Sequence, residues 1–373
     1  MIACSPSGII YRELPGREGQ PMAQKVLRFT QDETAAKQEV EYLGGRVVHK
    51  LSPTAFVAEL PETADSTGLT ASTSQPTQPL DEATQLAVTA WTETIDERVE
   101  AARDANEGLP WNAEGKEGPA EFGTPTATAR SEIAQSEIAE STGTPTSRYL
   151  VGSVAVGLVL VSRNMGTEAM TQQERIKIVQ EAQEGLDFLA GVEPQAQVSF
   201  AYDIRPITVD TAPGPYAGTS DQYERFERGW RDDALADMGY AAGRDGYRQY
   251  ANDLRVTLRT DWAYVAFFTK YPLNHFAYAV VEKVVMSNDN DNWGPDNINR
   301  VFAHESCHIF GAADEYGSCA CGGAHGHLGA PNNNCVNCFS SSTDQADCLM
   351  NANTLQMCSF SRRQIGWDRT LFP

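Results

Sequence analysis

The stretch AHESCHIFGAADEY at residues 303–316 decides the fold. On an α-helix, residues four positions apart point the same way and lie about 6 Å apart along the axis. His304 and His308 can therefore each offer one imidazole nitrogen to a single Zn²⁺ ion at about 2.0–2.1 Å. The spacing predicts a helix with two metal ligands on one face.

Two acidic residues complete the predicted site. Glu305 is rotated by about 100° from His304 around the helix, which places its carboxylate beside the metal, where it can accept a proton from water. Gly311 tolerates positive φ and lets the chain leave the helix, and the turn would bring Asp314 round as a third ligand. We therefore predict Zn²⁺ held by His304, His308 and Asp314, with Glu305 as the catalytic base.

Residues 148–373, which include this motif, predict an α/β catalytic domain. Thr171 to Leu189 has the spacing of a helix that starts at Thr171 with acidic and amide residues in its first turn, and a helix running into a strand is expected over Arg248–Leu258. The metal helix is expected over Asp296–Gly311. An order of strand, helix, several strands and a final helix is typical of an α/β sandwich. The predicted strands are Val151–Val161, Ala196–Tyr202, Trp262–Thr269 and His275–Val281.

Two segments beyond the helix extend the motif. Residues 348–351 (CLMN) are similar to a Met-turn, and residues 358–367 to the helix that closes such a domain. The pattern HExxHxxGxxD resembles the metzincin clan of zinc metallopeptidases, in the variant where Asp replaces a third His. The ending Asp314-Glu315-Tyr316 resembles the IgA-peptidase-like branch of bacterial metallopeptidases.

The resemblance covers residues 301–367 at the level of motifs. It implies a twisted mixed sheet, hydrolysis of a protein or peptide substrate, and Met350 as a support beneath the metal rather than a ligand. One departure is Ala352, which stands where some families place a Tyr that contacts the metal or substrate. The alternatives are a non-catalytic, metal-stabilised binding module and a zinc amidase acting on cell-wall peptides.

The N-terminal part is expected to form separate units. Residues 24–60 show the pattern strand, helix, strand, strand, so 1–62 is interpreted as a small α+β unit that resembles the propeptides of secreted proteases. A plain βαββ accessory module explains the pattern equally well. Residues 63–147 are predicted to be a low-complexity linker with a possible docking helix at 81–106.

The cysteines are concentrated near the motif: seven of the eight lie between Cys307 and Cys358. Six of them form a dense set that fits disulfides tying down the loop before the Met-turn; these are Cys319, Cys321, Cys335, Cys338, Cys348 and Cys358. The alternative is a structural zinc site at the CxC and CxxC pairs, 319/321 and 335/338, assisted by His325 or His327. Disulfides are favoured because secretion suits a protease with a propeptide. Cys307 is either free or paired with one of the set. Cys4 could bind the zinc as a latency switch, or be a free or lipid-linked cysteine.

Charge and hydropathy narrow the class of partner. The chain of 373 residues has 50 acidic and 29 basic side chains, a net charge of -21, and 23 of the acidic side chains lie in residues 1–147. Nucleic-acid binders need clustered Lys and Arg, so we expect no nucleic acid. No apolar run approaches the length of about 18 residues that spans a membrane. We expect a monomer in the extracellular space or cell envelope, although residues 1–20 show no ordinary signal peptide.

Two polar stretches have competing interpretations. Asn288–Gly294 offers several oxygen ligands that suit Ca²⁺, but it lacks EF-hand spacing and fits a turn-rich linker equally well. Glu224–Arg228 is interpreted as a solvated helix face.

Overall fold

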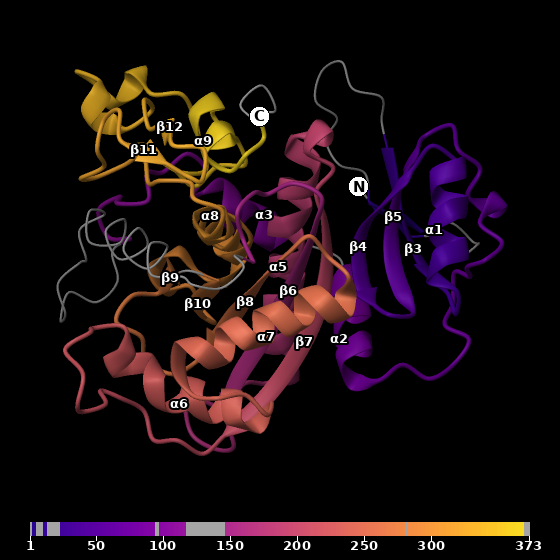
Figure 1. Ribbon diagram of the computed structural model, residues 1–373, viewed down its shortest axis with the longest axis horizontal. Coiled ribbons are helices and arrows are strands. Elements are labelled where there is room, and N and C mark those ends of the chain that lie inside the picture. The colour runs from indigo at the N-terminus through magenta and orange to yellow at the C-terminus, as the bar shows by residue number, and fades with distance from the viewer. Residues whose placement is uncertain are drawn as a thin grey trace.

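The computed structural model describes residues 2–4, 10–12, 23–93, 97–116, 146–280 and 282–368. Its centre is an eight-stranded mixed sheet with the order β3-β5-β4-β7-β6-β8-β10-β9 (Figure 1). The predicted α/β class with a mixed sheet is confirmed. The strands are β3 (Ala23–Phe29), β4 (Arg46–Ser52), β5 (Ala55–Pro61), β6 (Ser153–Arg163), β7 (Ser199–Val209), β8 (Trp262–Thr269), β9 (Ala277–Val280) and β10 (Lys283–Ser287).

Strands β4, β7, β6, β8 and β10 are parallel to one another, and antiparallel strands occupy both edges. β6 is central and nearly continuous in Val and Leu, as expected for a parallel strand buried on both faces. Its side chains alternate between two hydrophobic clusters, with Val156 and Leu158 in one and Val159 and Val161 in the other. The core therefore has two halves, one on each face of the sheet.

Helices cover both faces of the sheet (Figure 1). α2 (Glu82–Thr92), α5 (Gln172–Val192) and α8 (Ile298–Ile309) share one cluster with the sheet, and α6 (Glu224–Asp237) and α7 (Gly243–Leu258) share the other. α5 begins with a capping box in which Thr171 and Glu174 bond each other's backbone N–H, so the predicted helix start is confirmed. α8 lies within the predicted range 296–311.

The remaining elements are short. α1 (Glu33–Tyr42) packs on β4, α3 (Glu97–Asp104) follows α2, and α9 (Ser359–Gln364) closes the described chain. Two small hairpins lie outside the large sheet, β1 (Ile2–Cys4) with β2 (Ile10–Arg12) and β11 (Ala324–His325) with β12 (Ala330–Pro331). The helix predicted over 81–106 therefore comprises α2 and α3, with residues 94–96 outside the described residues.

The N-terminal strands continue the sheet of the C-terminal part. β4 pairs in parallel with β7, with His49 opposite Phe200. At this junction the buried Asp187 carboxylate contacts Lys25 Nζ and His49 Nε2, while His49 Nδ1 lies 2.8 Å from Tyr202 Oη. One sheet thus runs through residues 23–61 and 153–287, and the division at 62 and 147 stays a prediction.

The interpretation of Glu224–Arg228 as a solvated face is wrong for Glu227, whereas Arg225 is exposed and Glu224 and Arg228 are half-buried. Phe226 and Glu227, in the first turn of α6, are buried. The Glu227 carboxylate is bonded by Arg231 from the same helix and by Lys283 and Tyr278 from β10 and β9. The partners on the strands are distant in sequence, so the local pattern of charges gave no sign of them.

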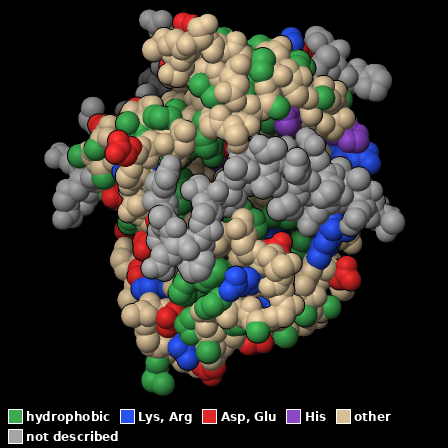
Figure 2. Space-filling view, turned by 90° about the vertical axis from the view of Figure 1, so that its left-hand side faces the viewer, with side chains coloured by type: hydrophobic (Ala, Val, Ile, Leu, Met, Phe, Trp, Pro, Cys, Tyr) green, Lys and Arg blue, Asp and Glu red, His purple; other side chains and the backbone are tan. Residues whose placement is uncertain are grey.

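Within the described residues, every helix is too short or too polar to cross a bilayer. On the face drawn in Figure 2, the described Lys and Arg side chains are interspersed with Asp and Glu.

Candidate metal centre

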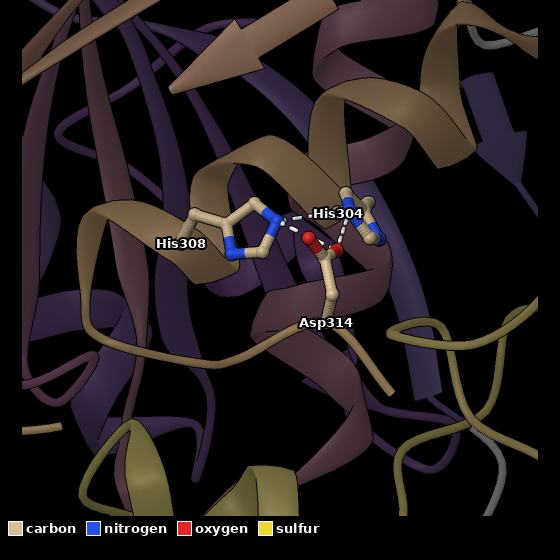
Figure 3. Close-up of side chains that lie close together, drawn as sticks. All are labelled: His304, His308 and Asp314. Carbon is tan, nitrogen blue, oxygen red and sulfur yellow. Dashed lines mark hydrogen bonds and ion pairs between the residues drawn. The ribbon is translucent and has the colours of Figure 1, made fainter. Parts of the chain in front are cut away.

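α8 carries the three motif residues. His304 and Glu305 are buried, and His308 is 17% exposed at its side chain. The two imidazoles point toward each other, with 3.0 Å between His304 Nε2 and His308 Nε2 (Figure 3). The i, i+4 spacing thus brings both nitrogens to one point, as the helical geometry requires.

Asp314 reaches the same point from the segment after the helix (Figure 3). Its Oδ1 lies 3.2 Å from Nε2 of His304 and 3.2 Å from Nε2 of His308. The chain turns at Gly311, whose φ is +95°. The structure therefore brings His304, His308 and Asp314 together as a group that could hold a metal ion.

Gly311→Ala is expected to disturb this group. A Cβ at Gly311 would lie 2.5 Å from the Cα of Gly326, and the positive φ adds about 1–3 kcal/mol of strain. Gly317→Ala is the matched control, because its φ is +60° and no atom lies within 4 Å of the added Cβ. We expect zinc affinity to fall at least tenfold in the first variant only. Equal affinities in the two variants would show that the close approach of Gly311 and Gly326 does not position Asp314.

The outer ring nitrogens fix the imidazole tautomers. His304 Nδ1 lies 2.9 Å from Leu349 O, and His308 Nδ1 lies 2.8 Å from Ala312 O. A carbonyl oxygen only accepts, so each Nδ1 carries a proton, and Nε2 is the nitrogen whose lone pair a metal ion would take in place of a proton. Metal-binding histidines are commonly held in this way.

Two buried oxygens at the centre have no hydrogen-bond donor. Asp314 Oδ1 and Glu305 Oε2 are fully buried and accept no hydrogen bond of standard geometry. Leaving a buried carboxylate oxygen unpaired is costly. A cation could bind the Nε2 atoms of the two imidazoles and offset the charge of the two carboxylates. These residues therefore fit a bound metal.

The electrostatics of the group also favour positive charge. Burial alone would lower the pKa of His308, but the carboxylates of Asp314 and Glu305 outweigh it and raise that pKa to about 9. Burial alone would raise the pKa of Asp314, but His308 and His304 hold it well below its usual range. The site is thus a buried concentration of negative potential.

The predicted Met-turn contacts the site through its backbone. Leu349 O receives the His304 Nδ1 hydrogen bond, and Glu315 N–H donates to Met350 O at 2.9 Å. Met350 itself is fully buried in the main hydrophobic cluster. The backbone of residues 349–350 therefore holds both His304 and the segment that carries Asp314, while the Met-turn and the role of Met350 stay predictions.

Trp111 is a site residue that sequence reasoning missed. Its ring centroid lies 5.2 Å from that of His304, and its Nε1 donates to Leu349 O at 2.6 Å. The backbone around it also pairs with the Met-turn, through Trp111 N to Asn351 O and through Gly108 N and Leu109 O to Asn353. No local signal connects a Gly-Leu-Pro-Trp sequence to a motif almost 200 residues away.

The cysteine-rich loop is closed by two disulfides, Cys319–Cys335 and Cys321–Cys338. The disulfide prediction is confirmed for these four cysteines, and the zinc alternative at them is wrong. Cys348 and Cys358, which the same prediction included, are free thiols. Cys307 is buried and free. The Cys4 side chain lies outside the described residues.

The predicted calcium loop, Asn288–Gly294, contains a short 3₁₀ turn at Asp291–Trp293. Burial and the neighbouring Asp289 raise the pKa of Asp291 to about 6. Within the described residues, neither group of three or more metal ligands includes this loop. Calcium binding stays a prediction.

Comparisons with known proteins add little. None of the protein-family models matches the chain, and no curated protein matches it. Among solved structures, metalloproteinase-II from Bacteroides fragilis is similar with a TM-score of 0.32 and 9% sequence identity, over 97% of this chain and 76% of that one. At that level of similarity, nothing about this chain follows from the comparison.

Proposed function

We propose that this protein is a zinc-dependent endopeptidase of metzincin type. His304, His308 and Asp314 would hold the metal, and Glu305 would act as the general base. The observation that carries the proposal is the convergence of two tautomer-fixed imidazoles and a carboxylate, beside a buried Glu305 oxygen that accepts no hydrogen bond. This is the donor set of a catalytic zinc site with three protein ligands.

The chain supplies the proton transfers of peptide hydrolysis. Zn²⁺ held by His304, His308 and Asp314 would lower the pKa of water towards 7 and polarise a peptide carbonyl. Glu305 takes the proton from water as it attacks the carbonyl carbon, and then delivers that proton to the leaving amine nitrogen. The carbonyl oxygens of Leu349 and Ala312 hold the two imidazoles in orientation through the reaction.

The presence of Glu305 favours an enzyme over a non-catalytic binding module. A module that needs metal only for stability has no use for a buried base. The two disulfides support action in an oxidising compartment, outside the cell or in its envelope.

Hydrolysis assays with the whole protein test the proposal and its alternatives. We expect casein or a mixed peptide library to be cleaved, cleavage to stop with a zinc chelator, and activity to return when Zn²⁺ is added back. Cleavage restricted to peptidoglycan fragments would favour the zinc amidase. Hydrolysis of none of these by zinc-loaded protein would contradict the peptidase proposal.

A further inference from the structure

A second cluster of metal-binding side chains lies behind the first. Glu315, Cys348 and Cys358 are buried, and one ligand atom from each lies within 4.8 Å of the other two. The residues come from three segments: the one after Asp314, the start of the Met-turn and the residue before α9. None of these side chains belongs to the catalytic group.

Ser361 adds a fourth donor atom to the cluster. Its Oγ lies 2.8 Å from Glu315 Oε1, 3.4 Å from Cys348 Sγ and 3.5 Å from Cys358 Sγ. Cys358 Sγ lies 3.0 Å from Glu315 Oε1. Sulfur and oxygen ligands of a tetrahedral zinc ion lie roughly 3.3–3.8 Å from one another. The two distances from Ser361 Oγ to the sulfur atoms fall in this range, whereas the two contacts of Glu315 Oε1 are shorter and would lengthen when an ion binds.

The charge of the cluster also calls for a cation. Glu315 is fully buried, and in the described part of the chain no Lys or Arg forms an ion pair with it. Its Oε2 accepts from Asn334 Nδ2 at 2.6 Å and from Asn351 Nδ2 at 3.4 Å, and its Oε1 accepts from Ser361 Oγ at 2.8 Å and from Cys358 Sγ at 3.0 Å. A metal ion bound here would replace the two hydrogen bonds to Oε1 and give the buried carboxylate a counter-charge.

Backbone amides are placed to support thiolates. Cys358 N–H donates to Cys348 Sγ at 3.3 Å, and Ser361 N–H donates to Cys358 Sγ at 3.4 Å. Such outer hydrogen bonds orient metal ligands and stabilise their charged form. The two thiols remain free, although four neighbouring cysteines form disulfides.

We propose that Glu315, Cys348, Cys358 and Ser361 form a second, structural zinc site. Thiolate ligands favour Zn²⁺ over hard cations such as Ca²⁺. On binding, the two thiols release their protons to solvent. The ion would join the segment after Asp314, the Met-turn and α9, and so fix the third catalytic ligand from behind.

Cobalt substitution of the full-length protein, purified without reductant, tests this site. Thiolate bound to Co²⁺ gives an intense near-ultraviolet charge-transfer band, which imidazole and carboxylate ligands do not give. We expect the band in wild type and in a His304→Ala/His308→Ala variant, whose zinc content should fall from two ions per chain to one. The charge-transfer band does not depend on peptidase activity. The second site can therefore be disproved while the proposed function stands, and the proposed function can be disproved while the second site stands.

Cysteine variants complete the test. The Cys348→Ser/Cys358→Ser variant should lose the band and one zinc ion per chain. The control is Cys307→Ser, which removes a buried thiol outside the two clusters and should keep the band and two zinc ions. If the double cysteine variant does not fold, the band in wild type and in the histidine variant still tests whether the second zinc site exists. Absence of the band in the folded histidine variant would overturn the proposal, and so would a Cys348–Cys358 disulfide found by peptide mapping.

Discussion

Glu305→Gln is expected to retain zinc and to lower kcat/KM for peptide hydrolysis by about 10²–10⁴-fold. Glutamine keeps the size of the side chain but cannot take the proton from the attacking water. Glu305 is buried and its Oε2 accepts no hydrogen bond, so the substitution breaks no contact of that oxygen. The measurement is peptide hydrolysis alongside zinc content per chain.

Asp344→Asn is the matched control, because it removes one carboxylate from an exposed position of the same C-terminal region. It should retain both zinc and activity. If Glu305→Gln were as active as wild type, Glu305 would not be the base. If it lost activity together with zinc, the residue would serve metal binding instead.

Glu227→Ala is expected to lower the free energy of unfolding by about 3–5 kcal/mol. Glu227 is fully buried, and its removal would take the carboxylate partner from the buried Lys283, while Arg231 would keep Glu224 and Asp232. Urea unfolding at pH 7 measures the effect. Glu33→Ala is the matched control, since Glu33 pairs with Lys50 but is 58% exposed, and it should cost no more than about 1 kcal/mol.

The effect of Glu227 should depend on pH in a defined direction. Burial alone would raise its pKa, but Lys283 and Arg231 outweigh it and lower the pKa from 4.5 to about 2. A depressed pKa contributes stability that is complete above about pH 4.5 and is lost as the pH falls toward 2. The gap between wild type and Glu227→Ala should therefore narrow below pH 4.5. A gap that stays constant down to pH 3 would argue against an ion pair as its source.

Features carried by nearby residues could be predicted from the sequence. The HExxH spacing gave the direction of both imidazoles because helix geometry fixes it. The start of α5 followed from Thr171 and Glu174, which bond each other directly. The buried character of β6 followed from its unbroken apolar run.

Features that depend on distant partners could not be predicted. The charges around Glu227 have the spacing of an exposed helix face, and the contacts of Glu227 itself with Lys283 and Tyr278 come from distant strands. Likewise, nothing local connects Trp111 to His304. Extension of the sheet by β4 depends on a parallel pairing with β7 across about 150 residues, and parallel pairing leaves no local turn signal.

The cysteines show the same limit. Their density predicted that some would be bridged, but spacing alone does not select partners. The fold pairs Cys319 with Cys335 and Cys321 with Cys338. It leaves Cys348 and Cys358 beside Glu315, which the sequence pattern did not suggest.

The most direct test of the central claim is an anomalous-diffraction map at the zinc edge from crystals of active protein. We predict a peak bonded at about 2.0–2.2 Å to His304 Nε2, His308 Nε2 and an Asp314 oxygen. An active, zinc-loaded protein with no peak among these three residues would contradict the account.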